Sequence, residues 1–352
     1  MKIVTIIGAR PQFIKSALVS EKIYTLDKFD EIIIHTGQHF DKNMSTIFFN
    51  QMDLPIPKYN LDINNMENGL MVKQMINKIE PILKLEKPDG ILVYGDTNST
   101  LAGSLAASKL NLSIFHIEAG LRSYNKCMQE ELNRILTDYL STILFCPTKN
   151  AVKNLKNEGI TTGVVYSGDV MYDAYLKFSM RTKDSKADLI ENNSIYALAT
   201  IHRQENTDSK DRLTSIFENL NKLNNKLKIV MPLHPRTKEK MKRYNIKTNI
   251  KILPPIGYLD MISLLNRSKF VITDSGGLQK EAFFAKKKCI ILREETEWTE
   301  LVDINANYLS SPKNLLNVYE TMSSNNCDFS YKLFGDGKAS ERIVDSIKEY
   351  FN

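Results

Sequence analysis

Residues 91–134 read ILVYGDTNSTLAGSLAASKLNLSIFHIEAGLRSYNKCMQEELNR. Two short apolar runs, residues 91–94 and 113–117, flank a segment rich in Ala, Leu and Ser that is typical of a helix packed on a sheet. The pattern predicts a strand, a helix and a second, parallel strand. The carboxyl ends of parallel strands lie at one edge of the sheet, and ligands of open α/β sheets bind at that edge.

An acidic residue beside a glycine follows each of the two predicted strands. Asp96 follows the first strand and Glu118 the second. A third acid, Glu130 or Glu131, stands where a new helix is expected to begin. Three carboxylates on one edge can serve as acid and base, because one accepts a proton while another supplies it. The structural alternative is that Asp96 caps a helix and that Glu118 pairs with Arg122.

The same alternation of strands and helices extends along most of the chain. Strands are predicted at 2–7, 31–35, 143–146, 164–166, 195–199, 228–231, 250–253, 270–273 and 289–292, and helices at 70–85, 132–140 and 340–351. Residues 60–68 are predicted to be a loop, and the polar residues 178–194 a connection between two α/β series. At 352 residues the chain is long for one hydrophobic core, so the sequence predicts two Rossmann-like domains.

Composition argues against several classes of protein. Hydrophobic residues make up 42% of the chain and charged residues 25%, which is ordinary for a soluble globular protein. The net charge of +6 is spread along the chain, so no nucleic-acid partner is expected, whereas a small anionic ligand is compatible. No apolar run approaches the roughly 18 residues of a membrane span, so no membrane partner is expected.

Cysteine and histidine spacing predicts neither a disulfide framework nor a metal site. The absence of any CxxC pair favours a reducing, cytoplasmic location; the four cysteines are Cys127, Cys146, Cys289 and Cys327. His35 and His39 are four residues apart, but Gly37 between them argues against a zinc pair on a helix. No metal ion is expected.

The first predicted strand ends at residues 8–11, GARP, which lead into a helix. Pro11 suits the first turn of that helix. Arg10 and Lys15 lie near its N-terminus, where a helix attracts negative charge, so the two side chains can hold an anion. The alternative is that both are ordinary surface cations.

A second candidate site lies at residues 273–281, TDSGGLQKE, where a predicted strand runs into a helix. Gly276 and Gly277 allow backbone N–H groups to approach a ligand, and the helix N-terminus suits a diphosphate. Ser275 adds a hydroxyl, and Glu281 can accept hydrogen bonds from ribose hydroxyls. Arg293, after the next strand, adds a cation for phosphate. The alternative is a plain turn in which Ser275 caps the helix.

His202 follows the first predicted strand of the second series. At that position it can reach a phosphate or a leaving-group oxygen, and histidine is the side chain best suited to proton transfer near neutral pH. The alternative is a histidine that serves only the loop or the core.

Together these segments resemble the non-hydrolysing UDP-N-acetylglucosamine 2-epimerases over nearly the whole chain. The shared motifs are GARPxxxK, TGQH, GDTNSTLAG, HIEAGLRS, EELNR, HRQEN, LHPR, TDSGGLQKE and RxxTEW. The resemblance implies the GT-B fold, in which two Rossmann-like α/β/α domains face each other across a cleft. Residues 1–170 would carry the catalytic carboxylates, 171–335 would bind UDP, and 336–352 would form a helix that packs back on the first domain.

The resemblance also implies a role for each candidate residue. The catalytic set is Asp96, Glu118, Glu130 and His202, and the substrate-binding set is Arg10, Lys15, Ser275, Gly276, Gly277, Glu281 and Arg293. Glu130 is preferred to Glu131 because the family usually reads Pro-Glu-Glu, with the first Glu catalytic. Here Gln129 takes the place of the proline.

The implied reaction inverts C2 of a UDP-N-acetylhexosamine, converting UDP-N-acetylglucosamine to UDP-N-acetylmannosamine for the synthesis of cell-surface polysaccharide precursors. UDP leaves, a 2-acetamidoglucal forms, and UDP adds back, so no metal or redox cofactor is required. A cytoplasmic homodimer is expected. The alternatives are a 2-epimerase of UDP-2,3-diacetamido-glucuronic acid, which the RxxTEW motif favours, a hydrolysing epimerase, and a GT-B glycosyltransferase. The loops after TGQH contain no arginine, which argues against allosteric activation by UDP-N-acetylglucosamine.

Overall fold

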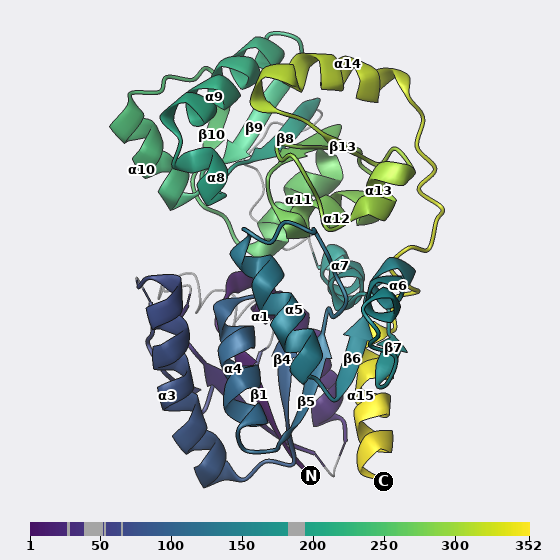
Figure 1. Cartoon of the computed structure of the whole chain (residues 1–352). Helices are drawn as coiled ribbons and strands as arrows, with labels where there is room; N and C mark the ends of the chain where they lie inside the picture. The colour runs from purple at the N-terminus through teal and green to yellow at the C-terminus, as the bar shows by residue number, and fades with distance from the viewer. Residues whose placement is uncertain (27–28, 39–51, 53, 65, 182–193) are drawn as a thin grey trace. The chain divides into compact units, whose positions relative to one another are not determined.

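The computed structural model describes residues 1–26, 29–38, 52, 54–64, 66–181 and 194–352 (Figure 1). The chain forms two compact units, each with its own parallel sheet. One unit comprises Met1–Leu176 and Lys332–Asn352, and the other comprises Lys177–Tyr331. The predicted pair of Rossmann-like α/β folds is confirmed.

The first unit contains a seven-stranded parallel sheet. Its strand order is β3 (Tyr59–Asn60), β2 (Asp30–His35), β1 (Lys2–Ile7), β4 (Gly90–Tyr94), β5 (Ser113–Ile117), β6 (Ile143–Cys146) and β7 (Val164–Tyr166). The order reverses between β1 and β4, which is the switch point where such sheets bind ligands. Tyr94 lies opposite Ile117 in the register of β4 and β5, so the two acid-bearing loops begin at the same level.

Helices cover both faces of this sheet. They are α1 (Arg10–Tyr24), α3 (Asn68–Glu86), α4 (Asn98–Ser108), α5 (Gln129–Leu140), α6 (Lys149–Asn157) and α15 (Ala339–Phe351), while α7 (Val170–Met180) contains the boundary between the two units. On one face, α4 packs between α3 and α5, and a Cβ on Gly103 would lie 2.7 Å from Ile6 Cδ1, which explains its small residues. Ile114 packs on that face, whereas Phe115 contacts Tyr350 of α15, so α15 covers the other face with α1.

The second unit contains a six-stranded parallel sheet. Its order is β10 (Lys251–Leu253), β9 (Lys228–Pro232), β8 (Tyr196–Thr200), β11 (Phe270–Thr273), β12 (Cys289–Ile291) and β13 (Asn307–Leu309). Its helices are α8 (Gln204–Thr207), α9 (Lys210–Asn224), α10 (Pro235–Tyr244), α11 (Tyr258–Arg267), α12 (Gly276–Phe284), α13 (Thr299–Asp303) and α14 (Leu315–Ser324), with a 3-10 turn η2 (Pro312–Asn314). Leu213, Phe217 and Leu220 of α9 recur at helical spacing and pack into the core.

The structure tests three predictions about connections. The predicted loop at 60–68 is confirmed for residues 61–64, 66 and 67, whereas Asn60 ends β3 and Asn68 begins α3. The predicted connection at 178–194 overlaps α7, whose buried residues Ala174 and Phe178 are four positions apart, and its residues 182–193 lie outside the described residues. Helix α5 begins at Gln129, so Glu130 and Glu131 lie in its first turn, where a helix start was predicted.

Candidate functional site

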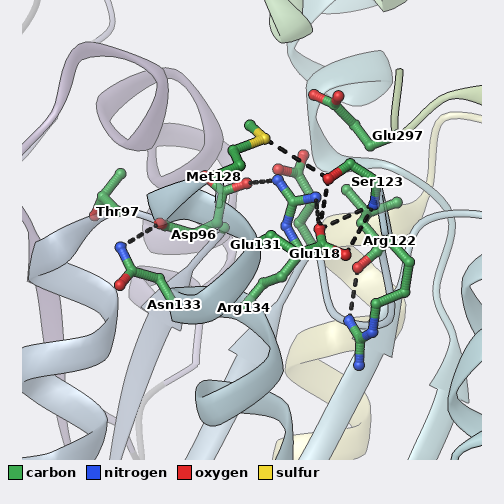
Figure 2. A network of polar contacts seen from close by, with 12 residues as sticks. Asp96, Thr97, Glu118, Arg122, Ser123, Met128, Glu131, Asn133, Arg134 and Glu297 are labelled. Atoms are coloured by element: carbon green, nitrogen blue, oxygen red, sulfur yellow. Dashed lines mark hydrogen bonds and ion pairs between the residues drawn. The ribbon is translucent and has the colours of Figure 1, made fainter. Parts of the chain in front are cut away.

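The loop after β4 holds Asp96 from several directions. Gly95 adopts a left-handed conformation (φ 63°), and its N–H donates to the Ile117 carbonyl oxygen at 2.8 Å. Asn133 Nδ2 donates to the Asp96 carbonyl oxygen at 2.9 Å, and the Arg134 guanidinium forms an ion pair with the Asp96 carboxylate (Figure 2). The N-cap of α4 is Thr97, so Asp96 does not cap that helix.

Glu118 lies beside this loop in a strained conformation. Its φ of 72° lies in the left-handed region, which costs a non-glycine residue on the order of 1–3 kcal/mol and is typical of functional sites. Its Oε1 accepts from the buried Lys15 Nζ at 2.5 Å. A Cβ on Gly95 would lie 3.3 Å from the same oxygen, so the Glu118 carboxylate borders the Asp96 loop. Arg122 pairs with Asp138 and Glu158 instead, so the structural alternative, in which Glu118 pairs with Arg122, is wrong.

The two adjacent acids of α5 have different environments. Glu131 is 1% exposed and accepts from the N–H groups of Ser123 and Tyr124 and from Arg134 Nη1 at 2.8 Å (Figure 2). Glu130 is partly exposed and forms no hydrogen bond or ion pair with any other described residue. Glu131 therefore holds the loop and Arg134 in place, whereas the Glu130 carboxylate is available to a ligand.

The N-terminus of α1 differs from a simple anion site. Gln12 Oε1 accepts from the N–H groups of Gly8 at 2.8 Å and Ala9 at 3.0 Å. Its Nε2 donates to the Tyr94 carbonyl oxygen at 2.9 Å, so this amide ties the first strand-end turn to the second. Lys15 is paired with Glu118, and Arg10 is the first residue of α1. Lys15 thus serves as the counter-charge of an acid.

In the second unit, Ser275 is the N-cap of α12, and its Oγ accepts from the Leu278 N–H at 3.3 Å. The two glycines have different surroundings. A Cβ on Gly276 would lie 2.4 Å from Glu297 Oε1, so a side chain there would displace the Glu297 carboxylate. A Cβ on Gly277 would meet only Ser275 Oγ, at 4.0 Å. No packing within the described residues requires Gly277, which leaves room for a ligand at the helix N-terminus.

Arg293 lies beside this helix and already has a counter-ion. The side chain is 3% exposed, and Nη1 donates to Glu297 Oε2 at 2.9 Å. Its Nη2 is buried and has no hydrogen-bond partner among the described residues. Glu281 is also buried, in the middle of α12. A phosphate at this position would share Arg293 with Glu297 or displace it.

His202 is oriented by a buried aspartate. Asp274 accepts from the N–H groups of His202 and Arg203 at 3.0 and 2.9 Å, and from Asn206 Nδ2 at 3.0 Å. His202 Nδ1 lies 3.2 Å from Asp274 Oδ1. The imidazole is 37% exposed and packs against His234 with ring centroids 5.5 Å apart. Asp274 therefore orients the imidazole through Nδ1.

Sequence reasoning missed the residues that position the candidate acids. Helix α5 buries Asn133, Arg134 and Asp138 but exposes Leu132 and Leu136. Polar residues on the inward face of a helix are the signal that reveals such a network, and it is visible only once the buried face is known. Gln12 and Asp274 also belong to this missed set.

No three His, Cys, Asp or Glu side chains are arranged to hold a metal ion in the part of the chain that the structure describes. His39, one of the two histidines considered for zinc, lies outside the described residues; His35 Nδ1 lies 3.1 Å from Asn60 Oδ1. No helix within the described ranges is both long enough and apolar enough to span a membrane.

The chain is similar to several known proteins. It is 51% identical, over 99% of both chains, to the UDP-2,3-diacetamido-2,3-dideoxy-D-glucuronate 2-epimerase of Pseudomonas aeruginosa. It is 41% identical, over 98% of both chains, to a UDP-N-acetylglucosamine 2-epimerase of Methanococcus maripaludis. The crystal structure of the Methanocaldococcus jannaschii UDP-GlcNAc 2-epimerase, in complex with UDP-GlcNAc and UDP, matches with a TM-score of 0.93 at 39% identity, covering 99% of this chain and 100% of that chain. Residues 21–348 match the family described as UDP-N-acetylglucosamine 2-epimerase, and the chain belongs to that family.

Proposed function

We propose that this protein is a non-hydrolysing epimerase that inverts C2 of a UDP-N-acetylhexosamine, interconverting UDP-N-acetylglucosamine and UDP-N-acetylmannosamine. The observation that carries the proposal is the edge of the first sheet, where Asp96 and Glu118 follow neighbouring strands and Glu130 has no described partner. Inversion at C2 requires one group to remove a proton and another to return it from the opposite face. Several carboxylates at one edge meet that requirement.

The proposed chemistry proceeds by elimination and re-addition. The C1–O bond breaks, UDP leaves with the bonding electrons, and a carboxylate takes the C2 proton to give a 2-acetamidoglucal. A second acid then protonates C2 from the other face, and UDP adds back to C1. The sugar C2–H is not acidic, so cleavage of C1–O leads, and carboxylates near the sugar stabilise its positive charge. These steps need no metal or redox cofactor.

We propose that residues of the second unit hold UDP. The N-terminus of α12 supplies backbone N–H groups and a partial positive charge, with Ser275, Gly276 and Gly277 at its first turn. Arg293 supplies a buried guanidinium. Glu281 would accept from the ribose hydroxyls, and His202 Nε2 would contact the leaving phosphate oxygen.

In the first unit, we propose that Arg10 and Lys15 contribute from α1. Lys15 acts through Glu118, whose charge it balances, and Arg10 at the start of the helix contacts the substrate.

A second substrate is favoured by a specific observation. The relative from Pseudomonas aeruginosa, at 51% identity, is named for UDP-2,3-diacetamido-2,3-dideoxy-D-glucuronate, whose C2 carries the same acetamido group. The proposed C2 chemistry is the same for both sugars. Turnover of the two substrates by one enzyme preparation, compared as kcat/KM, identifies which sugar this protein prefers.

The reaction type is tested by incubation with UDP-N-acetylglucosamine in deuterated water, followed by proton NMR. Deuterium at C2 of both epimers, with no accumulation of free UDP, is the expected result. Accumulation of UDP with free N-acetylmannosamine would show a hydrolysing epimerase instead. Sugar transfer to an added acceptor without C2 exchange would show a glycosyltransferase.

We also propose a cytoplasmic homodimer. The four cysteines are free thiols, which suits a reducing compartment. Helix α5 exposes Leu132, Leu136 and Tyr139 at 42, 48 and 60%, one face of a helix whose polar side chains are buried. Exposed apolar faces of this kind are typical of interfaces. Light scattering of the wild-type protein should give twice the chain mass, and Leu136→Glu should shift it toward the monomer, whereas Ile195→Glu, at another exposed position, should not.

A further inference from the structure

His116 of β5 is a buried histidine that links the two acid-bearing loops. Its side chain is 0% exposed and lies two residues before Glu118 on the same strand. Nε2 lies 2.8 Å from the Gly95 carbonyl oxygen, directly before Asp96, and Nδ1 lies 2.8 Å from Asp138 Oδ1. The position of the Asp96 loop therefore depends on a hydrogen bond from the neighbouring strand.

The partners of His116 determine which ring nitrogen donates to Gly95. A backbone carbonyl oxygen can only accept a hydrogen bond. His116 Nε2 faces such an oxygen, so Nε2 carries hydrogen and donates to it. Asp138 Oδ1 lies beside Nδ1, while its Oδ2 accepts from Arg122 Nη1 at 2.8 Å and from the Gly120 N–H at 3.1 Å.

Charged groups surround Asp138, the residue beside His116 Nδ1. Arg122 donates to Glu158 through Nε at 2.6 Å and Nη2 at 2.7 Å, so Arg122 bridges Asp138 and Glu158. Burial by itself lowers the pKa of Arg122, but Glu158 and Asp138 together raise it above its ordinary value. Cys146, close to Asp138, stays a neutral thiol because burial raises its pKa. Arg122 and the Gly120 N–H therefore hold the Asp138 carboxyl group in place beside His116.

We propose that His116 is a positioning residue, whose Nε2–H fixes the Gly95 carbonyl and through it the acid Asp96. The Gly95 N–H is held by the Ile117 carbonyl oxygen, so the residue is clamped on both sides by β5 and cannot rotate independently. Asp138 holds the imidazole through Nδ1, so Nε2 stays directed at the Gly95 carbonyl oxygen. This inference rests on the proposed function, because it assigns Asp96 to the chemistry.

Two variants separate the two nitrogens of His116. In general, the amide nitrogen of glutamine can replace Nε2, and that of asparagine can replace Nδ1. His116→Gln therefore keeps a donor for Gly95, whereas His116→Asn keeps only the donor for Asp138. We expect kcat of His116→Asn to be about 10- to 100-fold below that of His116→Gln, because small misplacements of a catalytic group have effects of this size. The UDP dissociation constant should be the same in both. Equal kcat values in the two variants would overturn the proposal.

Nitrogen-15 NMR of the wild-type protein tests the hydrogen bond without any assay of activity. At pH 8 the Nε2 nitrogen of His116 should carry hydrogen. A bare Nε2 in the wild type would contradict the inference, even if an asparagine variant failed to fold. Should the wild type show hydrogen on Nε2 but no C2 exchange, the proposed function fails while the hydrogen-bond assignment stands.

Discussion

At the scale of single residues, the buried carboxyl group of Glu31 has a perturbed pKa. Glu31, in β2, accepts from Thr5 Oγ1 and from Ser20 Oγ at 3.0 Å, while its Oε2 is buried without a hydrogen-bond partner among the described residues. Burial raises the pKa of Glu31 to about 7, against the opposing effect of these hydrogen bonds. The carboxyl group is therefore protonated in the folded protein at pH values where it is ionised in the unfolded chain.

The sign of the resulting pH dependence follows from this raised pKa. Between the unfolded value of 4.5 and about 7, folding takes up a proton, so the free energy of unfolding falls as pH rises. The loss is at most about 3 kcal/mol, and partial exposure of the stem makes it smaller. Glu31→Gln should remove this slope. Urea denaturation of both proteins at pH 5 and pH 8 should show that the substitution raises the free energy of unfolding only at pH 8. If the free energies of the two proteins change with pH in parallel, the prediction is wrong.

Glu130 and Glu131 are adjacent in sequence but should behave differently on substitution. Glu131→Gln disrupts buried charge-assisted hydrogen bonds and should lower the free energy of unfolding by about 1–3 kcal/mol. Glu130→Gln removes no described contact, so stability should stay within about 0.5 kcal/mol. Turnover of Glu130→Gln should nevertheless fall by roughly 10²–10⁴. Denaturation and C2-exchange assays of both variants test these predictions. A large loss of stability in Glu130→Gln would contradict the assignment of Glu130 as a residue without a structural role.

At the scale of elements, α15 depends on a partner distant in sequence. Its own N-cap residue, Lys338, makes no side-chain capping bond. Asp173 of α7 instead accepts from the Ser340 N–H at 2.8 Å and from the Ser340 hydroxyl. At the other end, the Tyr350 hydroxyl lies 2.9 Å from Ser113 Oγ. Helix α15 is thus anchored at both ends to the first unit.

Asp173→Ala should therefore loosen the start of α15. Removing a buried acceptor costs about 1–3 kcal/mol, and amides near Ser340 should exchange faster in hydrogen-exchange mass spectrometry. Asp345→Ala, which alters an exposed acid in the same helix, provides the control and should leave exchange unchanged. Equal exchange rates near Ser340 in Asp173→Ala and the wild type would show that α15 does not need this cap.

At the scale of the whole molecule, the two units should respond differently to UDP. The N-terminal amides of α4 are already bonded to protein atoms: Ser99 N–H donates to Gln38 Oε1 at 3.1 Å and Thr100 N–H to Thr97 Oγ1 at 3.3 Å. At α12 there is open space beside Gly277. UDP should therefore slow hydrogen exchange at residues 275–278 and leave residues 98–101 unaffected. Protection of α4 alone would show that UDP binds the first unit and would contradict the proposed site at α12.

Arg293→Ala should weaken UDP binding by about tenfold to over a hundredfold, the value of a charge-assisted contact. Arg243→Ala removes the same charge from an exposed position of α10 and serves as the control. Isothermal calorimetry with UDP measures both dissociation constants. An unchanged value for Arg293→Ala would remove this residue from the proposed phosphate site.

The fold class was predictable from local pattern. Apolar runs such as residues 91–94 and 270–273, each followed by small or acidic residues and a helix, are sufficient to indicate parallel α/β units. Strand β3 and helix α7 were missed, because a strand of two residues has no period and the polar residues after residue 178 obscured the helical repeat. The loops bearing Asp96 and Glu118 could also be placed, because the ends of adjacent parallel strands share one edge.

The partners of those acids were settled only by tertiary structure. Lys15 reaches Glu118 across 103 positions of sequence, and the aspartate that binds His116 lies 22 positions away, on another element. Such pairings depend on which helix face turns inward, and α5 inverts the usual rule by burying its polar face. Local sequence shows the hydrophobic period of a helix or strand, but contacts between residues distant in sequence form only when helices and strands pack together. The amino-acid pattern therefore specified the sheets and their acidic edge, and packing assigned each acid its counter-charge.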